Sequence, residues 1–433
     1  MKILILNYSD NNGGAAIASH RLFSLLKQCG IDISFEVLEK KTTDSIQSLF
    51  TKTPFFDNII LIRLMKKIIL RIILYTKKKL RLDFKTSNIF LHSQNKKNSI
   101  DLDKINTSDY DIIHFHWINH DMFSIEAIAK IIKPIVWTMH DSWPFCGAEH
   151  HPDILENDIR FIQGYTKNNK PKTTFGPDIC RKTWERKKKA WNETKFNFIA
   201  PSNYLKDCFD KSALFKDSKS PCIVIPNIVP EKIFRPLDKN NLKEQYQIPL
   251  HKKVIGFGAA YDITEEKSSK GGHILLSVLK KITDESNYHF VIFGNANVAF
   301  LEAIKIPTFN AGFISNPYIL AGIYNLCNVV VCPSLIENLP NICLESLFCG
   351  IPVAAFDTGG IPDIVEHKNT GYLAKCFDTI DMNNGIMYCI NNYNELSKNS
   401  LKKAHTDFNN KLIYKKHIEL YESVLREHKG HCK

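Results

Sequence analysis

The amino-acid sequence predicts an α/β protein made of two successive doubly wound domains, each with its own parallel sheet. Short apolar runs of strand length alternate with amphipathic stretches at helical spacing, which is typical of parallel sheets with crossover helices. The alternation restarts after residues 223–227, which indicates a second unit. The chain has 433 residues, of which 44% are hydrophobic, enough for two or three domains with cores of their own.

The first half of the chain begins with a predicted strand at residues 2–6 and a loop that ends at Gly14. An amphipathic helix follows over residues 15–29 and ends at Gly30, because glycine readily adopts the left-handed conformation that closes a helix. Apolar runs predict further strands at residues 33–38, 111–116, 135–139 and 196–200. These elements define an N-terminal domain over residues 1–226.

The second half repeats the pattern over residues 227–410. Apolar runs predict strands at residues 254–258, 288–293, 328–332 and 352–356, with helices between them at 272–282, 317–326 and 341–348. Apolar residues at helical spacing over 411–429 predict a final helix in the tail 411–433. We expect this helix to pack on one domain, with the N-terminal domain as a candidate, or across both.

Composition and charge exclude several classes of protein. Lys and Arg number 57 against 45 Asp and Glu, a net charge of +12, and the mixed composition excludes collagen, coiled-coil and low-complexity chains. The first strand turns polar at Asn7, too soon for a signal peptide. No run approaches the roughly 18 apolar residues of a membrane span. We therefore expect a cytoplasmic protein.

Cysteine spacing gives no sign of a metal site. The twelve cysteines include no CxxC pair, so neither a zinc ribbon nor a thioredoxin motif is supported. The nearest metal-like group is Cys146, His150, His151 and Cys180, whose spacing fits no standard site. We interpret its members as ordinary thiols and surface histidines. Asp101-Leu102-Asp103 lies in a polar stretch and is interpreted as a loop, not as a metal-binding motif.

One segment departs from the alternation. Residues 59–82 are apolar, with Lys and Arg at helical spacing on one face. Two interpretations stay open: a core-packed helix with a solvated basic edge, and an amphipathic helix lying on an anionic membrane surface. No nucleic-acid-binding module or aromatic-interleaved basic motif occurs, so nucleic acid is not an expected partner.

Several polar or glycine-rich loops follow predicted strands, at the edge where open α/β sheets bind ligands. Gly13 and Gly14 open the first helix, and residues this small let a phosphate or sugar approach the backbone. His140 follows a strand of the first domain. Lys267 and Lys270 precede a helix of the second domain, where an ammonium group can neutralise a diphosphate.

The most informative loop joins a strand of Val and Cys to a helix, with Glu337 in the loop and Glu345 on the helix. A carboxylate accepts two hydrogen bonds, which suits the cis-diol of a ribose or hexose. Exposed backbone amides near Asn338 and Leu339 could meet a sugar or phosphate oxygen. Complementarity to the helix dipole also explains two glutamates near a helix start, but it leaves the glycine-containing loop at 357–362 unexplained.

These motifs resemble those of the retaining glycosyltransferases of family 4, which have the GT-B fold. The resemblance rests on Gly13-Gly14, Ile225-Pro226-Asn227, Lys270-Gly271, the Glu337-to-Glu345 spacing, Gly350-Ile351-Pro352-Val353 and Gly371-Tyr372. Residues 139–150 are similar to enzymes that build bacterial surface polysaccharides. The fold implied is two Rossmann-like domains facing each other across a cleft, with the acceptor on residues 1–226 and the nucleotide sugar on 227–410.

The resemblance also implies roles for residues of the second domain. Glu345 would hold the ribose hydroxyls of the nucleotide, Glu337 the hydroxyls of the donor sugar, and Lys270 the diphosphate. Asn338 and Leu339 would offer backbone amides to the sugar and phosphate.

Gly13 and Gly14 would let the N-terminal domain close on the donor, with His140 near the reactive end of the sugar. Many relatives have an arginine a few residues before the lysine of Lys-Gly, and Lys267 is the candidate substitute here.

The implied reaction transfers a sugar from a nucleotide-diphosphate donor to a glycan or lipid-linked saccharide with retention of configuration, without cofactor or metal. The implied pathway is the synthesis of polysaccharide, O-antigen or lipopolysaccharide, with the enzyme peripheral on the inner membrane face if residues 59–82 bind anionic lipid. The main alternative is a nucleotide-sugar epimerase of the same architecture. A nicotinamide oxidoreductase lacks its GxGxxG fingerprint, and the presence of Lys270 and Glu345 argues against a non-catalytic subunit.

Overall fold

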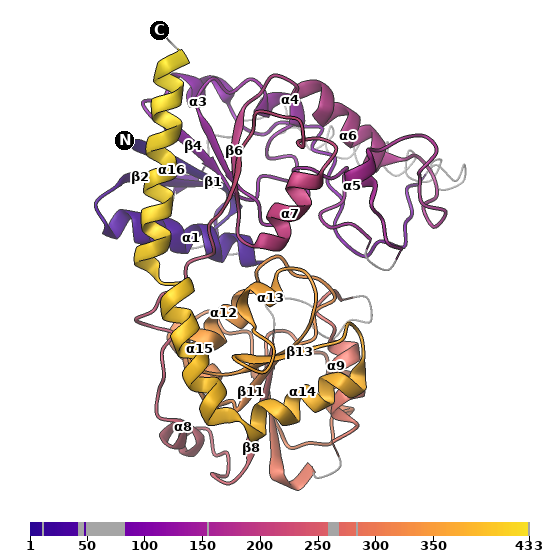
Figure 1. Cartoon of the computed structure of the whole chain (residues 1–433), viewed down its shortest axis with the longest axis vertical. Coiled ribbons are helices and arrows are strands. Elements are labelled where there is room, and N and C mark those ends of the chain that lie inside the picture. Colours follow the sequence, from indigo (N-terminus) through magenta and orange to yellow (C-terminus); the bar gives the residue numbers. More distant parts are fainter. Residues whose placement is uncertain are drawn as a thin grey trace, which may run out of the picture.

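The computed structural model describes residues 1–10, 13–41, 47–48, 83–153, 156–258, 268–282 and 285–431. These residues form two α/β domains stacked along the long axis of the molecule (Figure 1), each with a parallel sheet. The predicted fold class is confirmed. Lys267 and residues 59–82 lie outside the described residues, so the expectations for them stay predictions from sequence.

The N-terminal domain contains a seven-stranded parallel sheet in the order β3-β2-β1-β4-β5-β6-β7. Its strands are β1 Lys2–Ser9, β2 Asp32–Glu39, β3 Gln47–Ser48, β4 Ile112–Phe115, β5 Ile135–Thr138, β6 Phe196–Ala200 and β7 Cys222–Val224. Its helices are α1 Gly13–Gln28, α3 Leu102–Thr107, α4 Ile125–Ile128, α5 Arg160–Gln163, α6 Ile179–Ala190 and α7 Asn203–Lys211. Central strands β4, β5 and β6 are buried along their whole length, as expected for strands covered on both faces.

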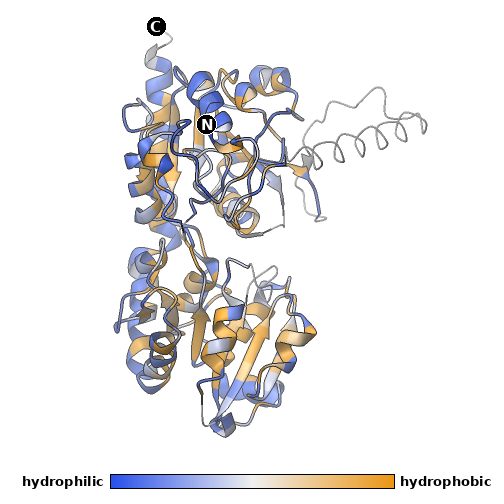
Figure 2. Ribbon diagram, turned by 90° about the vertical axis from the view of Figure 1, so that its right-hand side faces the viewer, coloured by the Kyte–Doolittle hydropathy of each residue, from blue (hydrophilic) through white to orange (hydrophobic). Residues whose placement is uncertain are grey.

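The C-terminal domain contains a six-stranded parallel sheet in the order β10-β9-β8-β11-β12-β13. Its strands are β8 Lys253–Gly258, β9 Tyr288–Phe293, β10 Thr308–Gly312, β11 Val329–Cys332, β12 Val353–Phe356 and β13 Gly371–Ala374. Its helices are α8 Lys239–Gln245, α9 Gly272–Leu279, α10 Val298–Glu302, α11 Pro317–Leu326, α12 Asn341–Phe348, α13 Ile361–Ile364, α14 Thr379–Asn391 and α15 Tyr393–Asp407, with a 3-10 turn at Glu285–Asn287. Figure 2 shows hydrophobic residues concentrated on the central strands.

The last helix, α16 Asn410–His431, leaves the C-terminal domain and runs along the N-terminal one (Figure 1). Ile413, Tyr421 and Val424 are buried in the same apolar cluster as Ile3 and Ile5 of β1. The Tyr421 hydroxyl is also 2.8 Å from Nδ1 of His114 in β4. Burial of this apolar face ties the end of the chain to the first sheet.

One local prediction is wrong. Asp101-Leu102-Asp103 begins a helix and is not a loop, because the Asp101 carboxylate accepts a hydrogen bond from the backbone N–H of Asp103 and caps α3. Among the described residues, no helix has the length and apolar content needed to cross a bilayer.

Candidate functional site

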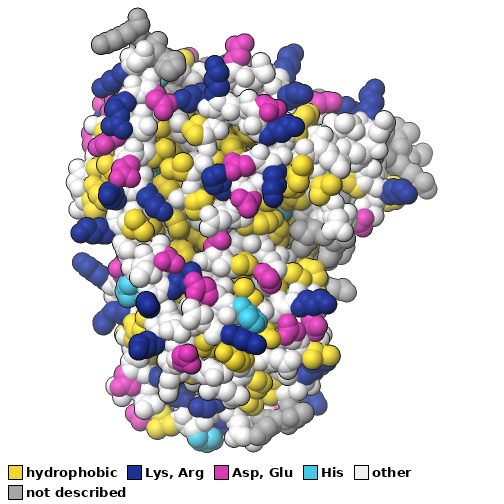
Figure 3. Space-filling view, in the orientation of Figure 1, with side chains coloured by type: hydrophobic (Ala, Val, Ile, Leu, Met, Phe, Trp, Pro, Cys, Tyr) yellow, Lys and Arg dark blue, Asp and Glu magenta, His cyan; other side chains and the backbone are white. Residues whose placement is uncertain are grey.

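A cavity of about 800 Å³ lies between the two domains, lined by residues from both. The structure brings together in its wall almost all the residues predicted for the site: Gly13, Gly14, His140, Lys270, Glu337, Asn338, Leu339 and Glu345. On the face shown in Figure 3, basic and acidic side chains are interspersed over both domains and do not gather into one basic patch.

Lys270 and Glu337 form an ion pair on the C-terminal side of the cavity, with Nζ 2.5 Å from Oε1. The Ser334 hydroxyl donates to the same carboxylate oxygen at 2.9 Å. Burial lowers the pKa of Lys270, but the carboxylate of Glu337 outweighs this and leaves the pKa raised. Because its side chain is 37% exposed, the charged ammonium can reach an anionic ligand in the cavity.

The loop before α9 is pressed against the loop after β11. Gly271 has φ +69°, and a Cβ there would lie 1.9 Å from the Pro333 carbonyl oxygen, so only glycine fits. The backbone N–H of Leu335 donates to the Ser269 carbonyl at 2.8 Å. These contacts set Lys270 opposite Glu337, although the two residues come from different loops.

The loop at 357–362 supports the Glu337 loop from the other side. The N–H of Gly360 donates to the Glu337 carbonyl at 2.8 Å. A Cβ on Gly360 would lie 1.7 Å from the Asn338 carbonyl oxygen, and one on Gly359 would lie 2.1 Å from the Glu337 carbonyl oxygen. The two glycines therefore allow the close approach that holds Glu337 in place.

The Asn338 side chain joins the two domains. Its Nδ2 donates to the carbonyls of Met139 at 3.1 Å and His140 at 3.3 Å, and its Oδ1 accepts from the Ser202 hydroxyl at 2.6 Å. Only a backbone role was expected for this residue from its sequence position. The side-chain role was missed because its partners come from the other domain, more than a hundred residues away.

Glu345 on α12 is held by two partners. Arg21 Nη2 of α1 donates to Oε1 at 2.5 Å, and the Tyr324 hydroxyl of α11 donates to Oε2 at 2.7 Å. The Arg21 and Glu345 side chains are 10% and 5% exposed. Binding of a ribose by Glu345 therefore requires it to share or exchange these partners. Arg21 lines the cavity and was missed by sequence analysis, since nothing in its helix marks it.

His140 and His151 form part of the cavity wall contributed by the N-terminal domain. Burial lowers the pKa of each to about 4, so both rings are neutral at pH 7. The His140 Nε2 atom is 2.8 Å from Nδ1 of His116 in the segment after β4. A neutral ring suits hydrogen bonding to a sugar hydroxyl better than ion pairing.

The loop between these histidines is held by Asp141. Its carboxylate accepts from the indole N–H of Trp117 at 3.0 Å and lies 2.5 Å from Nδ1 of His150. Burial raises the pKa of Asp141, but interactions with His150 outweigh it and lower the pKa to about 2. The interpretation of His150 as a surface residue is wrong, since it is only 4% exposed. The ring can be buried because its second nitrogen also has a partner, the Ser93 hydroxyl 2.9 Å away.

Comparison with known proteins finds a family match in the C-terminal half of the chain. Residues 238–406 match the model described as "Glycosyl transferases group 1". This part of the chain is therefore similar to group 1 glycosyltransferases. N-acetyl-alpha-D-glucosaminyl L-malate synthase of Bacillus anthracis is 22% identical over 212 residues, 47% of this chain and 54% of that protein. D-inositol 3-phosphate glycosyltransferase of Corynebacterium jeikeium is 29% identical over 153 residues, 32% of this chain and 35% of that protein.

These alignments span about half and about a third of the two curated relatives. The whole fold is matched by a solved structure, that of Anabaena HepE in complex with UDP-glucose, with a TM-score of 0.62 and 17% identity over 98% of this chain and 100% of that one. The matched region thus lies in a two-domain GT-B fold, with the predicted site between the domains.

Proposed function

We propose that this protein is a glycosyltransferase that moves a sugar from a nucleotide-diphosphate donor to a hydroxyl of a glycan or lipid-linked saccharide, with retention. The observation that carries the proposal is the cavity between the domains, where the region similar to group 1 glycosyltransferases presents Lys270, Glu337 and Glu345. The solved HepE structure of the same fold holds UDP-glucose, which supports a nucleotide sugar as the ligand class.

In the proposed reaction, the bond between the anomeric carbon and the β-phosphate oxygen breaks, and the acceptor hydroxyl oxygen bonds to that carbon from the same face. The hydroxyl proton passes to the departing phosphate oxygen. Lys270 neutralises the charge that develops on the diphosphate, an electrostatic role comparable to that of an oxyanion hole. We propose that the step needs no protein nucleophile, cofactor or metal ion.

Donor binding would reorganise the ion pair on the C-terminal wall. Lys270 is bound to Glu337 at 2.5 Å, and a diphosphate would compete for the ammonium. Glu337 would then be free to accept hydrogen bonds from sugar hydroxyls. The ion pair therefore holds both groups near their proposed working positions before the donor arrives.

The epimerase alternative finds no support in the relatives described above, which are named as glycosyltransferases or as a synthase. The names of the relatives contain L-malate and D-inositol 3-phosphate, so the acceptor varies among similar proteins. Four parts of the proposal rest on the sequence alone, through the family resemblance and the basic segment. These are the glycan or lipid-linked acceptor, the polysaccharide or lipopolysaccharide pathway, the cytoplasmic location, and the membrane contact through residues 59–82.

A thermal-shift screen tests the donor site. The full chain is heated with UDP, GDP, ADP, CDP and dTDP, and the matching nucleotide should raise the melting temperature as ligand saturates the native state. Lys270→Ala should lose most of this shift, whereas Lys281→Ala, which removes an exposed lysine outside the cavity, should keep it. Equal shifts for the two variants, or no shift with any nucleotide, would contradict the proposal.

A further inference from the structure

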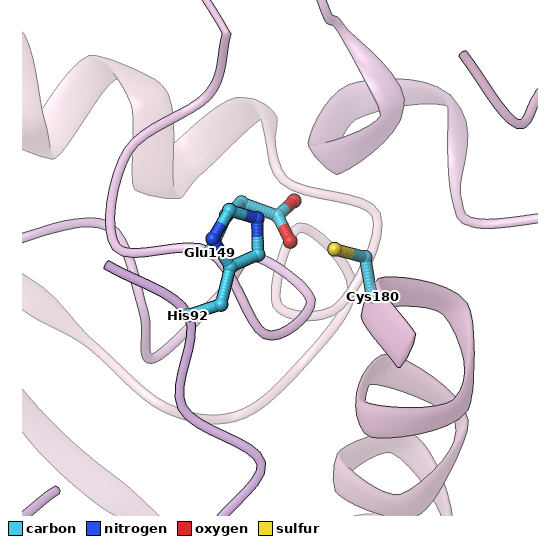
Figure 4. Close-up of side chains that lie close together, drawn as sticks. All are labelled: His92, Glu149 and Cys180. Atoms are coloured by element: carbon cyan, nitrogen blue, oxygen red, sulfur yellow. The ribbon is translucent and has the colours of Figure 1, made fainter. Parts of the chain in front are cut away.

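A second group of chemically reactive side chains lies in the N-terminal domain, away from the cavity lining. One ligand atom each of His92, Glu149 and Cys180 lies within 4.8 Å of the other two. Figure 4 shows the His92 ring and the Cys180 thiol on either side of the Glu149 carboxylate. The residues come from three segments: the stretch before α3, the loop after β5, and the first turn of α6.

Hydrogen bonds leave a free lone pair on two of these groups. His92 Nδ1 is 2.8 Å from the Phe90 carbonyl; a carbonyl only accepts, so Nδ1 carries the proton and Nε2 of the neutral ring is unprotonated. The Tyr165 hydroxyl donates to Glu149 Oε1. Within the described part of the chain no N–H or O–H donates to Oε2, although Glu149 is only 1% exposed. The hydrogen-bonding neighbour on this side of the carboxylate is the Cys180 thiol.

This pattern is the one that metal ligands show. A ligating histidine commonly donates its other N–H to a backbone carbonyl, and a ligating carboxylate is held through its other oxygen. A buried carboxylate oxygen that receives no N–H or O–H hydrogen bond is otherwise costly. The thiol of Cys180 lies beside the same carboxylate, and a bound cation would take the place of the thiol proton.

We propose that His92 Nε2, Glu149 Oε2 and Cys180 Sγ bind a zinc ion, with water as the fourth ligand. One nitrogen, one oxygen and one sulfur donor suit Zn²⁺, whereas Mg²⁺ and Ca²⁺ take oxygen ligands. Tetrahedral zinc bonds of about 2.0–2.3 Å place ligand atoms roughly 3.5 Å apart, so atoms separated by as much as 4.8 Å would draw together by about 1 Å on binding the ion. Two negative ligands balance the charge of the ion.

The nearby positive charge of Arg160 is partly neutralised by its own ion pairs. The Arg160 guanidinium interacts electrostatically with both Glu149 and His92. It is already paired with Asp158 at 3.0 Å and Asp178 at 3.5 Å. Cys146 is a less suitable ligand, because the Lys187 ammonium donates to its backbone carbonyl at 3.1 Å and places a positive charge near its thiol. Of the four residues in the metal-like group considered from sequence, only Cys180 belongs to the proposed site.

The proposed ion is structural. None of its three ligands lines the cavity, but Glu149 directly precedes His150, which binds Asp141, and His151, which lines the cavity. A zinc ion would thus tie the cavity loop to α6 and to the segment before α3. The inference does not depend on the proposed sugar transfer.

Cobalt binding tests the site. The full chain is freed of metal with a chelator and titrated with Co²⁺ alone. Wild-type protein should bind about one Co²⁺ with a thiolate-to-cobalt absorption band that Zn²⁺ abolishes. Cys180→Ser should lose the band, Cys146→Ser should keep it, and His92→Gln and Glu149→Gln should weaken Co²⁺ binding at least tenfold.

Circular dichroism checks that each variant is folded. If Cys180→Ser is not folded, X-ray absorption of the zinc-loaded wild type decides, with one sulfur and three nitrogen or oxygen neighbours expected. The proposal is overturned if the wild type shows no thiolate band, if folded Cys180→Ser keeps it, if Cys146→Ser loses it, or if X-ray absorption finds no sulfur neighbour.

Discussion

Arg21 of α1 and Glu345 of α12 form a buried ion pair across the domain boundary, with Nη2 2.5 Å from Oε1. The pair connects α1, whose first turn contains Gly13 and Gly14, to the helix proposed to hold the ribose. In the proposed mode of donor binding, the contact between the domains and the ribose would compete for this one carboxylate.

Removal of Arg21 should destabilise the protein because it leaves Glu345 buried with only the Tyr324 hydroxyl. We expect Arg21→Ala to lower the free energy of unfolding by roughly 3 kcal/mol, as for other broken buried pairs. The double variant Arg21→Ala/Glu345→Gln should recover part of this loss, as measured by urea unfolding. Strictly additive losses in the double-mutant cycle would show that the pair is not coupled.

Lys270→Ala should reduce the stabilisation of the transition state for sugar transfer. The loss of a charge-assisted hydrogen bond to the diphosphate, worth about 1.5–3 kcal/mol, predicts a fall in kcat/KM of roughly ten- to a hundredfold. Steady-state rates with the nucleotide sugar identified by thermal shift provide the measurement, with Lys281→Ala as the control. An unchanged kcat/KM would remove Lys270 from the mechanism.

Gly360→Ala should damage both stability and transfer. The added Cβ would lie 1.7 Å from the Asn338 carbonyl oxygen and 2.7 Å from Ser202 Cβ, and overpacking of this kind costs about 1–3 kcal/mol. Gly322→Ala in α11 is the matched control, because its Cβ would meet nothing nearer than 3.7 Å; alanine there should stabilise the helix by about 0.5–1 kcal/mol. Thermal unfolding compares the two, and equal melting temperatures would contradict this account.

Stability should fall below neutral pH. Burial lowers the pKa of His140, His151 and His417 to about 4, whereas unfolded histidine titrates near 6.5. The folded state therefore binds fewer protons than the unfolded state, and this contribution to stability is present above about pH 6.5 and lost as the pH falls towards 4.

The measurement is urea unfolding at about pH 7 and about pH 5. His417→Gln should reduce the difference in the free energy of unfolding between the two values. His251→Gln, at an exposed position, should leave the difference as it is in the wild type. A pH dependence that is the same in all three proteins would show that buried His417 does not contribute.

The sequence by itself determined the alternation of strands and helices, and with it the two parallel sheets. The predicted strands are β1, β2 and the inner members of both sheets. Most of the inner strands are buried on both faces and therefore read as apolar runs. The strands not predicted are β3, β7, β10 and β13, which are the edges of the two sheets. Edge strands are covered less completely, as the partly exposed β10 shows, so their sequences lack that signal.

The site residues were predictable where they follow a strand, because the topology of a parallel sheet brings the carboxyl ends of its strands to one edge. Only the tertiary structure decided which of these groups touch. The Lys270–Glu337 and Arg21–Glu345 pairs, the Asn338 bridge and the His92–Glu149–Cys180 group each join segments far apart in the chain. Such contacts depend on how the loops and domains pack, and a local sequence pattern carries no information about a partner that arrives from another element.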